Sequence, residues 1–236
     1  LAVAIFISYG ADDSDSANQP EPVSGRGYDI MGTMLTMQVY GSEGEQLIET
    51  SKELLQEVEA KMSSHVEDSE VKKINQAAGE EPVAVSEITY EVIETNLDYA
   101  ARTNGSFDPT MGPIIDLWGI STDQPQVPAE EEIKEKLKLV DYSQVDLFPA
   151  QREVLLEKAG MELNVGGSAK GFATDRVIDF LRSEAEIKSG YVNLGGNIAV
   201  LGTKPNGELW SIGIQDPASP RGDLMAKVEG EDMTVI

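Results

Sequence analysis

The sequence contains no cysteine and a single histidine, His65. The absence of cysteine excludes disulfide bonds, a thiol nucleophile and any metal site built from thiolates. One histidine cannot form a multi-histidine metal site, and it leaves little room for a catalytic triad that depends on histidine. A metal ion in this protein would therefore be held by oxygen ligands, which favours Mg²⁺ or Ca²⁺.

Basic residues are also scarce, because 18 Lys and Arg stand against 42 Asp and Glu, for a net charge of −24. Such a charge repels nucleic acids and anionic membrane surfaces, so we expect neither as a partner. It also repels a free nucleotide, unless basic groups or a divalent cation neutralise the ligand locally. An anion site in this chain would therefore predict a bound metal.

The sequence has no long hydrophobic run; the chain starts with a short apolar one, LAVAIFISYG. This run at residues 1–10 is far shorter than the roughly 20 residues that cross a bilayer. We interpret it as the apolar part of an export signal whose start is missing; the alternative is a first β-strand. A lipoprotein would need a lipid-bearing cysteine after this run, and none follows, so the sequence does not decide whether the protein is anchored to a membrane. We expect an extracytoplasmic location.

The acidic, Ser- and Pro-rich residues 11–27 predict a disordered tether. Residues 28–236 then form the predicted domain, which stops inside what reads as a strand, so we expect the true protein to continue. Periodic apolar positions predict helices at 45–62, 86–104, 129–139 and 168–182, and a short helix capped by Asp68 or Ser69.

Alternating residues predict strands at 31–41, 153–157, 161–165 and in three later segments, YVNLGGNIAVLG, LWSIGIQDP and DLMAKVEGEDMTVI. YVNLGGNIAVLG forms either a strand pair or one bulged strand. Because strands follow one another in adjacent runs, we predict an α+β fold with a largely antiparallel sheet flanked by helices. The segment GSFDPTMGPIIDLWG is apolar but rich in Gly and Pro, so we expect irregular structure, either packed in the core or shaped around a flat ligand.

The segment from Asn164 to Gly171, NVGGSAKG, joins a predicted strand to a predicted helix through a glycine turn. Such a junction exposes backbone N–H groups where no side chain blocks a ligand, which suits an anion such as phosphate. Lys170, close to the helix start, is disfavoured there by the helix dipole unless a negative ligand is present. The alternative is a turn whose glycines serve only close packing, with Lys170 in solvent.

Six motifs in order resemble those of the ApbE family of FAD-dependent protein FMN transferases, once called thiamine biosynthesis lipoproteins. The resemblance covers about residues 28–236. The motifs are Met31-Gly32-Thr33, Met62-Ser63 with the downstream Asp68-Ser69-Glu70 and Ile74-Asn75, GSFDPTMGPIIDLWG, NVGGSAKGFATD, YVNLGGNIAVLG and WSIGIQDP.

This resemblance implies an extracytoplasmic α+β protein that binds FAD together with Mg²⁺. Such a protein moves the FMN half of FAD to a threonine hydroxyl of a partner flavoprotein subunit and releases AMP. Some members instead hydrolyse FAD to FMN and AMP. A non-enzymatic flavin-binding protein outside the cytoplasm is a further alternative.

The resemblance also implies roles for individual positions. Met31 lies beside the flavin, and Gly167 gives its carbonyl oxygen to the metal. Asn164 stands where many members have an aspartate, and Lys170 contacts the cofactor. Ser64, His65 and Val66 occupy the segment that contacts the flavin. Gly105, Ser106 and Phe107 match the stretch whose backbone meets the ligand, and Asp108 holds that loop.

Three departures from the family pattern stand out. His65 occupies a position where many transferases have tyrosine, which leaves the choice between transfer and hydrolysis open. Ser168 replaces a usual aliphatic residue. The family's downstream histidine and Asp-Pro-x-Thr-Gly run, which supplies the main metal ligands, is absent before Ile236, so we expect the catalytic residues beyond that position. Asp108 and Asp216 are the remaining acidic candidates for a metal ligand or a general base. Each precedes a proline, however, and an Asp-Pro pair also initiates turns.

Overall fold

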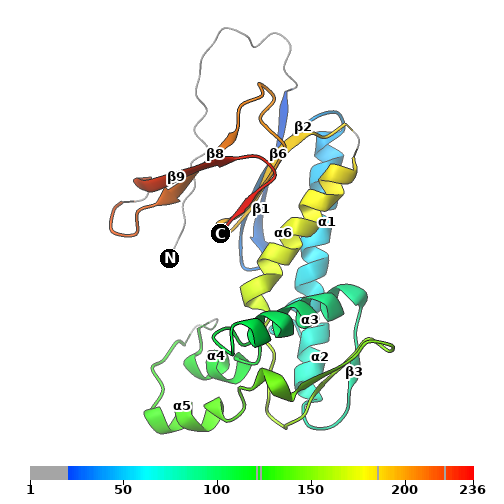
Figure 1. Cartoon of the computed structure of the whole chain (residues 1–236), viewed down its shortest axis with the longest axis vertical. Helices are drawn as coiled ribbons and strands as arrows, with labels where there is room; N and C mark the ends of the chain where they lie inside the picture. The colour runs from blue at the N-terminus through cyan, green and yellow to red at the C-terminus, as the bar shows by residue number, and fades with distance from the viewer. Residues whose placement is uncertain (1–20, 121, 123, 185, 221) are drawn as a thin grey trace. The chain divides into compact units, whose positions relative to one another are not determined.

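The computed structural model of the protein describes residues 21–236, with the exception of 121, 123, 185 and 221. Its contacts divide the chain into two units: unit 1 contains the residues up to Gln56 together with Lys170–Ile236, and unit 2 contains Glu57–Ala169. Two helices, α1 (Gly44–Met62) and α6 (Gly166–Ser183), continue across the boundary (Figure 1). No helix in the described part of the chain is both long enough and apolar enough to span a bilayer.

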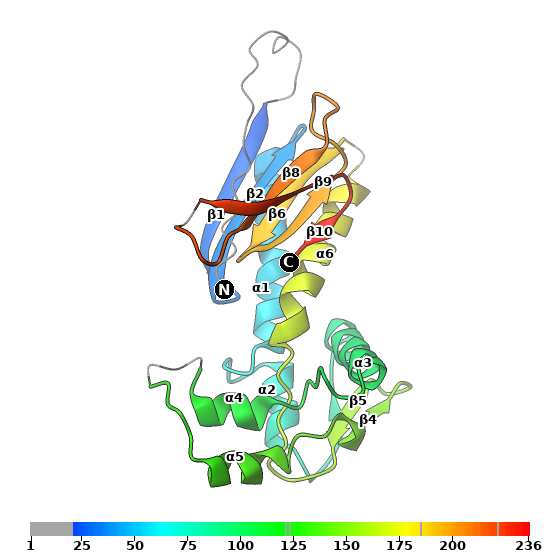
Figure 2. The same cartoon turned by 60° about the vertical axis from the view of Figure 1, so that its left-hand side comes forward.

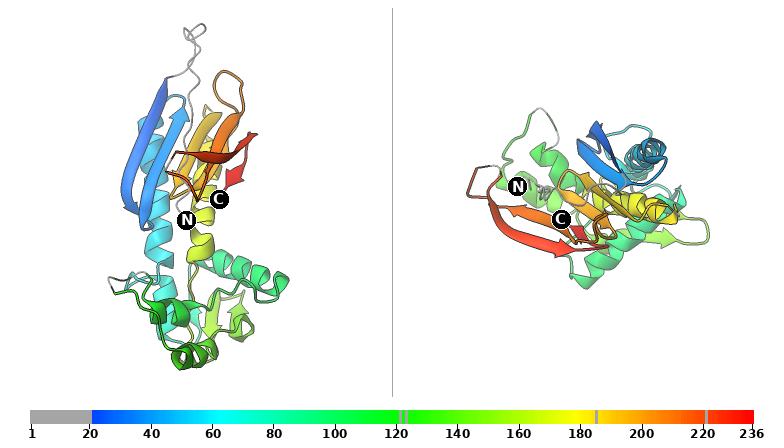
Figure 3. Two further views of the ribbon diagram at one scale, coloured as in Figure 1. Left: turned by 90° about the vertical axis from the view of Figure 1, so that its left-hand side faces the viewer. Right: turned by 90° about the horizontal axis from the view of Figure 1, so that it is seen from above.

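Unit 1 is built on a five-stranded sheet in the order β1-β2-β6-β7-β10. All four of its pairings are antiparallel. The strands are β1 (Pro22–Ile30), β2 (Thr33–Tyr40), β6 (Ser189–Leu194), β7 (Asn197–Leu201) and β10 (Thr234–Val235). Helices α1 and α6 cover one face of this sheet, and the hairpin of β8 (Trp210–Gln215) and β9 (Leu224–Gly230) lies over the other (Figures 2 and 3).

The two faces of the sheet bury different side chains because successive strand residues point to opposite sides. On the helix-covered face, α1 packs so closely on β1 that a side chain on Gly25 would collide with Ile48. On the other face Trp210, which is 2% exposed, packs against Tyr40 and Tyr191, with ring centroids 6.4 and 5.7 Å away. Trp210 and Ile212 thereby anchor the β8–β9 hairpin on the sheet.

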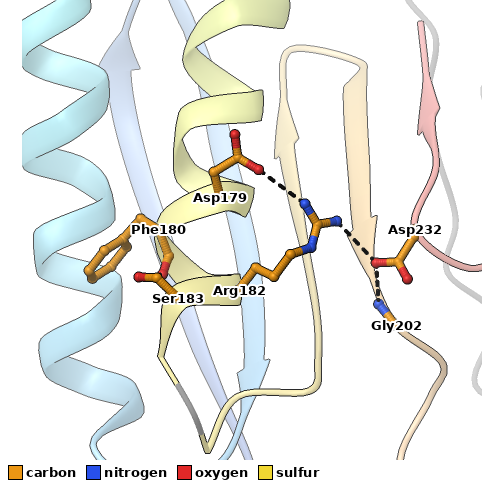
Figure 4. A network of polar contacts seen from close by, with 6 residues as sticks. All are labelled: Asp179, Phe180, Arg182, Ser183, Gly202 and Asp232. Atoms are coloured by element: carbon orange, nitrogen blue, oxygen red, sulfur yellow. Dashed lines mark hydrogen bonds and ion pairs between the residues drawn. The ribbon is translucent and has the colours of Figure 1, made fainter.

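An arginine near the end of α6 ties the helix to the turn before β10 (Figure 4). The Arg182 guanidinium lies 3.0 Å from the Asp179 carboxylate and 3.2 Å from that of Asp232. Asp232 also accepts a hydrogen bond of 3.1 Å from the Gly202 N–H. This N–H and the Arg182 charge together lower the pKa of Asp232 against the opposing effect of burial. The network therefore fixes the short edge strand β10 beside β7.

Unit 2 contains a three-stranded antiparallel sheet in the order β3-β5-β4, surrounded by short helices (Figure 1). Its strands are β3 (Val83–Ala84), β4 (Val145–Phe148) and β5 (Glu153–Leu156). Its helices are α2 (Glu70–Gln76), α3 (Glu87–Arg102), α4 (Gly112–Trp118), α5 (Glu130–Leu137) and the 3₁₀ helix η2 (Tyr142–Gln144). With every named strand pairing of the described residues antiparallel, the predicted α+β class is confirmed.

The strongly amphipathic helices form where the periodicity predicted them, as α1, α3, α5 and α6. Ser69 is the N-cap of α2, and its side-chain oxygen accepts a hydrogen bond from Lys72 N. The two glycines Gly195 and Gly196 form the turn of the β6–β7 hairpin, with φ values of +63° and +100°. YVNLGGNIAVLG is therefore a strand pair rather than a bulged strand.

Three local predictions are wrong, and one strand was missed. Strand β1 begins at Pro22, so the disordered tether predicted for 11–27 does not hold from that residue on; positions 1–20 lie outside the described residues. Strand β4 was not predicted. Residues 112–118, expected to be irregular, form helix α4, because Pro113 stands in the first turn, where the missing N–H costs nothing. Residues 161–165 form no regular strand and make one isolated bridge.

Candidate functional site

The first turn of α6 leaves one backbone donor unsatisfied. The Asn164 Oδ1 atom accepts a hydrogen bond of 2.9 Å from Gly166 N. The N–H groups of Ser168 and Ala169 both bond to Val165 O, at 3.0 and 2.9 Å. The Gly167 N–H has no acceptor within the described part of the chain. A free N–H at a helix start, with no side chain on its residue, is a local donor for an anion.

The extended segment before α6 is held against the loop that precedes α4. Asn164 N donates to Pro109 O at 2.8 Å, and Gly112 N donates to Glu162 O at 3.2 Å. These bonds flank a parallel bridge between Met111 and Glu162. Residues 109–112 therefore act as a neighbouring strand for residues 162–164.

This pairing brings the Gly105–Phe107 segment close to the α6 turn. A Cβ atom on Gly167 would lie 3.3 Å from the Phe107 ring, so the ring edge covers one side of the glycine. Phe107 is half-buried, whereas Gly105 and Ser106 are exposed. Three of the predicted positions, Phe107, Asn164 and Gly167, are thus neighbours in unit 2.

Asp108 connects this segment to the rest of unit 2. Its Oδ1 atom accepts hydrogen bonds from Thr110 N at 2.8 Å and from Thr110 Oγ1 at 2.6 Å. Its Oδ2 atom accepts one from Tyr142 N at 3.2 Å, and Thr110 Oγ1 in turn accepts one from Asp141 N at 2.8 Å. Of the two open readings of this aspartate, the geometry supports a carboxylate that organises a turn.

The helix before Gly105 ends in a left-handed residue other than glycine. Asn104 has φ +51° and follows the C-cap Thr103, and Gly105 has φ +76°. Gly105 N donates to Ala100 O at 2.9 Å, which is the six-to-one bond of a Schellman motif. Gly105 therefore serves as the second residue after the cap, one position later than the left-handed residue that ends α3.

The Ser64–Val66 segment lies in a short loop between α1 and α2. Ser69 Oγ donates to Ser63 O at 2.6 Å, and Ser69 N donates to Val66 O at 3.1 Å. Ser69 is fully buried, so these bonds form away from competing water. The loop is thereby closed at its base, while His65 and Val66 are exposed at its tip.

Glu70 fixes α2, the helix that follows this loop, to the start of α3. Its Oε2 atom accepts hydrogen bonds from Ser86 N at 3.0 Å and Ser86 Oγ at 2.7 Å, and Lys61 lies 3.6 Å from its Oε1. Burial raises the pKa of Glu70, but hydrogen bonds from Thr89 and Ser86 and the Lys61 charge outweigh it, so its pKa lies below the ordinary 4.5.

We expect Glu70→Gln to lower the free energy of unfolding by about 1–2 kcal/mol at neutral pH, since charge-assisted hydrogen bonds are lost. A lowered folded-state pKa stabilises the fold above the unfolded-state value, and this contribution disappears as pH falls through the folded-state value. The difference between wild type and variant in urea unfolding should therefore shrink below the ordinary 4.5. Glu67→Gln, which alters an exposed hydrogen bond to Gln76, is the matched control and should change little.

Two carboxyl groups, those of Glu162 and Asp116, interact near the segment that leads into the α6 turn. Burial raises the pKa of Glu162, and the Asp116 carboxyl raises it further by hydrogen bonding and by its charge, while Lys72 and Lys136 oppose the shift. Glu162 is the residue that bridges to Met111. The raised pKa reflects a negative charge on Glu162 that burial and the neighbouring Asp116 disfavour.

The family model of the "ApbE family" matches residues 31–236 of this sequence. The chain belongs to the ApbE family. An FAD:protein FMN transferase of Treponema pallidum is 34% identical over 206 residues, which cover 80% of this chain and 56% of the relative. One of Klebsiella pneumoniae is 30% identical over 207 residues, covering 88% and 63%. The chain thus spans between about half and two thirds of these relatives.

Solved structures of ApbE proteins have the same fold. The ApbE protein of Thermotoga maritima superposes with a TM-score of 0.84 at 30% identity, covering 91% of this chain and 69% of that structure. The flavin transferase ApbE of Vibrio cholerae superposes with a TM-score of 0.82 at 27% identity, covering 91% and 70%. The ApbE-like architecture predicted from the motifs is therefore confirmed.

Two predicted ApbE site residues belong to unit 1. Met31 occupies the two-residue turn between β1 and β2, with φ +51°, next to Gly32 with φ +65°. Two left-handed residues match the turn type that suits a tight hairpin, and methionine is an uncommon residue there. Lys170 lies three residues after Gly167 in α6.

The described residues contain no group of three or more His, Asp or Glu side chains close enough together to hold a metal ion. Gly167 is the second residue of α6, where the carbonyl points along the helix and the N–H points out of its start. This orientation favours the N–H of Gly167 over its carbonyl as the group that meets a ligand.

Sequence reasoning missed three residues that build this site. Thr110 and Tyr142 donate hydrogen bonds to the Asp108 carboxylate, and Gly112 allows residues 109–112 to approach Glu162. The Asp-Pro-Thr order contains a weak signal for Thr110, because an aspartate often accepts a hydrogen bond from the residue two positions later. No local pattern identifies Tyr142, which comes from a segment distant in sequence.

Proposed function

We propose that the protein transfers the FMN half of FAD to a threonine hydroxyl of a partner flavoprotein subunit and releases AMP. The observation that carries this proposal is the α6 turn, where the free Gly167 N–H lies beside the Phe107 ring. Two ApbE relatives named FAD:protein FMN transferase, at 34% and 30% identity, support the same reaction class.

The reaction requires a hydroxyl oxygen to attack the FMN-side phosphorus of the FAD pyrophosphate. A threonine O–P bond forms, the bond from that phosphorus to the bridging oxygen breaks, and AMP leaves with this oxygen while the hydroxyl loses its proton. Charge accumulates on the pyrophosphate oxygens during this step. Fixed backbone donors stabilise such charge without reorganisation during the reaction.

The chain's own residues suit positioning in this reaction. The Gly167 N–H donates to a phosphate oxygen. Lys170 of the same helix, whose ammonium forms no ion pair with any described residue, is a further source of positive charge. Asn164 orients the turn by holding Gly166 N. Phe107 gives an apolar surface for the ligand, and its N–H donates to Thr103 Oγ1 at 3.1 Å.

Three further features are part of this proposal. We expect the reaction to require Mg²⁺, because a chain with a net charge of −24 otherwise repels a dianionic pyrophosphate. The ion would neutralise that charge when bound. We also expect the protein to act outside the cytoplasm, on the grounds of the apolar start and acidic segment of the sequence, and to be held at a membrane only if its N-terminus carries an anchor.

The proposal is tested by incubating the whole protein with FAD, Mg²⁺ and a candidate acceptor subunit. We expect an acceptor that carries covalent FMN fluorescence in a denaturing gel, equimolar AMP, and loss of both after EDTA. Replacing the acceptor threonine by alanine should abolish the label. Release of free FMN and AMP without labelling would instead identify an FAD pyrophosphatase. Tight FAD binding without AMP release would identify a flavin-binding protein.

A further inference from the structure

Asn75 makes a two-point contact with the main chain just before the α6 turn. Its Nδ2 atom donates to Leu163 O at 3.0 Å, and its Oδ1 atom accepts from Leu163 N at 2.8 Å. Asn75 lies near the end of α2, and 88 positions separate it from Leu163. A side-chain amide thus satisfies both backbone groups of one residue, as a neighbouring strand would.

The contact explains why residues 161–165 are extended without belonging to a sheet. Along an extended chain, the N–H and C=O of one residue point to one edge, and those of the next residue point to the opposite edge. Glu162 and Asn164 bond on one edge to residues 109–112, which leaves Leu163 facing the other edge. Leu163 is fully buried, so its backbone polar groups need a partner, and Asn75 is that partner.

The amide itself is rigidly supported. Val71 and Ile74 of α2 are 0% and 1% exposed, and Ser69 caps the helix start. Asn75 is therefore presented by a helix that is fixed in the core of unit 2. Leu163, which Asn75 holds, directly precedes Asn164. With partners on both edges, the chain enters the α6 turn in a fixed direction.

We propose that Asn75 is a positioning residue for anion binding at the α6 turn. It holds Leu163 so that Asn164 can cap Gly166 and the Gly167 N–H stays directed at the ligand's phosphate. This inference deepens the proposed function and rests on it, because it concerns how the same site binds the pyrophosphate of FAD. It assigns to Asn75 no contact with the ligand.

Two variants test the proposal in the whole protein. Asn75→Leu removes both hydrogen bonds at similar volume. Asn75→Asp retains an acceptor for Leu163 N but places a carboxylate against Leu163 O. We expect each to weaken FAD binding by about tenfold or more, a change of about 1.4 kcal/mol, measured by fluorescence titration. Gln76→Ala is the matched control, because among the described residues this neighbouring amide bonds to exposed Glu67, and the variant should bind FAD like wild type.

Riboflavin separates positioning from general loss of structure, because it has the flavin ring but no phosphate. If Asn75 acts through the phosphate-binding turn, riboflavin affinity should change less than about twofold in both variants. A second readout uses Asn75→Asp alone: a protonated carboxyl has one donor and one acceptor, as an amide does. Its FAD affinity relative to wild type should recover as pH is lowered, and the ratio removes the titration of neighbouring Glu162 from the comparison.

The outcomes are distinct. Wild-type FAD affinity in both variants would overturn the inference and leave the proposed function intact. Equal losses for FAD and riboflavin would overturn it as well, since they indicate a structural role. Failure of wild type itself to bind FAD would overturn the proposed function and the inference together. If Asn75→Leu does not fold, Asn75→Asp decides, through the riboflavin comparison and its recovery at low pH.

Discussion

Replacing Gly112 by alanine should lower the free energy of unfolding of unit 2 by about 3 kcal/mol or more, at the upper end of what overpacking costs. A Cβ atom there would lie 2.6 Å from Glu162 O and 2.6 Å from Glu162 Cβ. Both are atoms of the main chain or next to it, so no side-chain rotation relieves the collision. The Gly112 N–H bond to Glu162 O would break, and with it the pairing of residues 109–112 with the α6 approach.

Urea unfolding followed by circular dichroism checks this prediction. Gly171→Ala is the matched control, because its Cβ would meet only Asn197 Nδ2 at 3.6 Å, an ordinary contact. Gly171 lies inside α6, where alanine is favoured over glycine by about 0.5–1 kcal/mol, so this variant should be as stable as wild type or more stable. Equal stability of Gly112→Ala and wild type would show that residues 109–112 and Glu162 are not paired as described.

Asp108→Ala is expected to have the second-largest effect, with about 3 kcal/mol of unfolding free energy lost and FAD binding weakened about a hundredfold or more. The substitution removes the acceptor of Thr110 N, Thr110 Oγ1 and Tyr142 N at once. Thr110 is fully buried, so its freed N–H and hydroxyl cannot be fully resolvated. The binding loss follows because Phe107, the ring beside Gly167, directly precedes this aspartate.

Asp108→Asn separates the two halves of this carboxylate. Its amide oxygen can still accept from Thr110, but its NH₂ group then faces the Tyr142 N–H, donor against donor. We therefore expect an intermediate loss of both stability and FAD affinity, measured by urea unfolding and fluorescence titration. An Asp108→Ala protein that is fully stable but unable to transfer FMN would contradict this structural role and indicate direct participation in catalysis.

The sequence by itself determined the elements whose signals are local. Amphipathic spacing within 45–62 or 168–182 decides a helix wherever that segment lies, because one apolar stripe must be buried. A cap at Asp68 or Ser69 was predictable for the same reason, since the bond that Ser69 makes lies within one helical turn. The motif order was also sufficient to identify the family, and with it the segments that form the candidate site.

Only the tertiary structure decided how those segments are held. Residues 161–165 alternate like a strand, yet their partners are a loop on one edge and the Asn75 side chain on the other. Pro113 looks like a helix breaker until its place in the first turn of α4 is known. Likewise only the structure shows that the Gly167 N–H is left free, while the N–H groups of Gly166, Ser168 and Ala169 have acceptors in the preceding segment. Such contacts join residues far apart in sequence, and no short-range pattern of side chains encodes them.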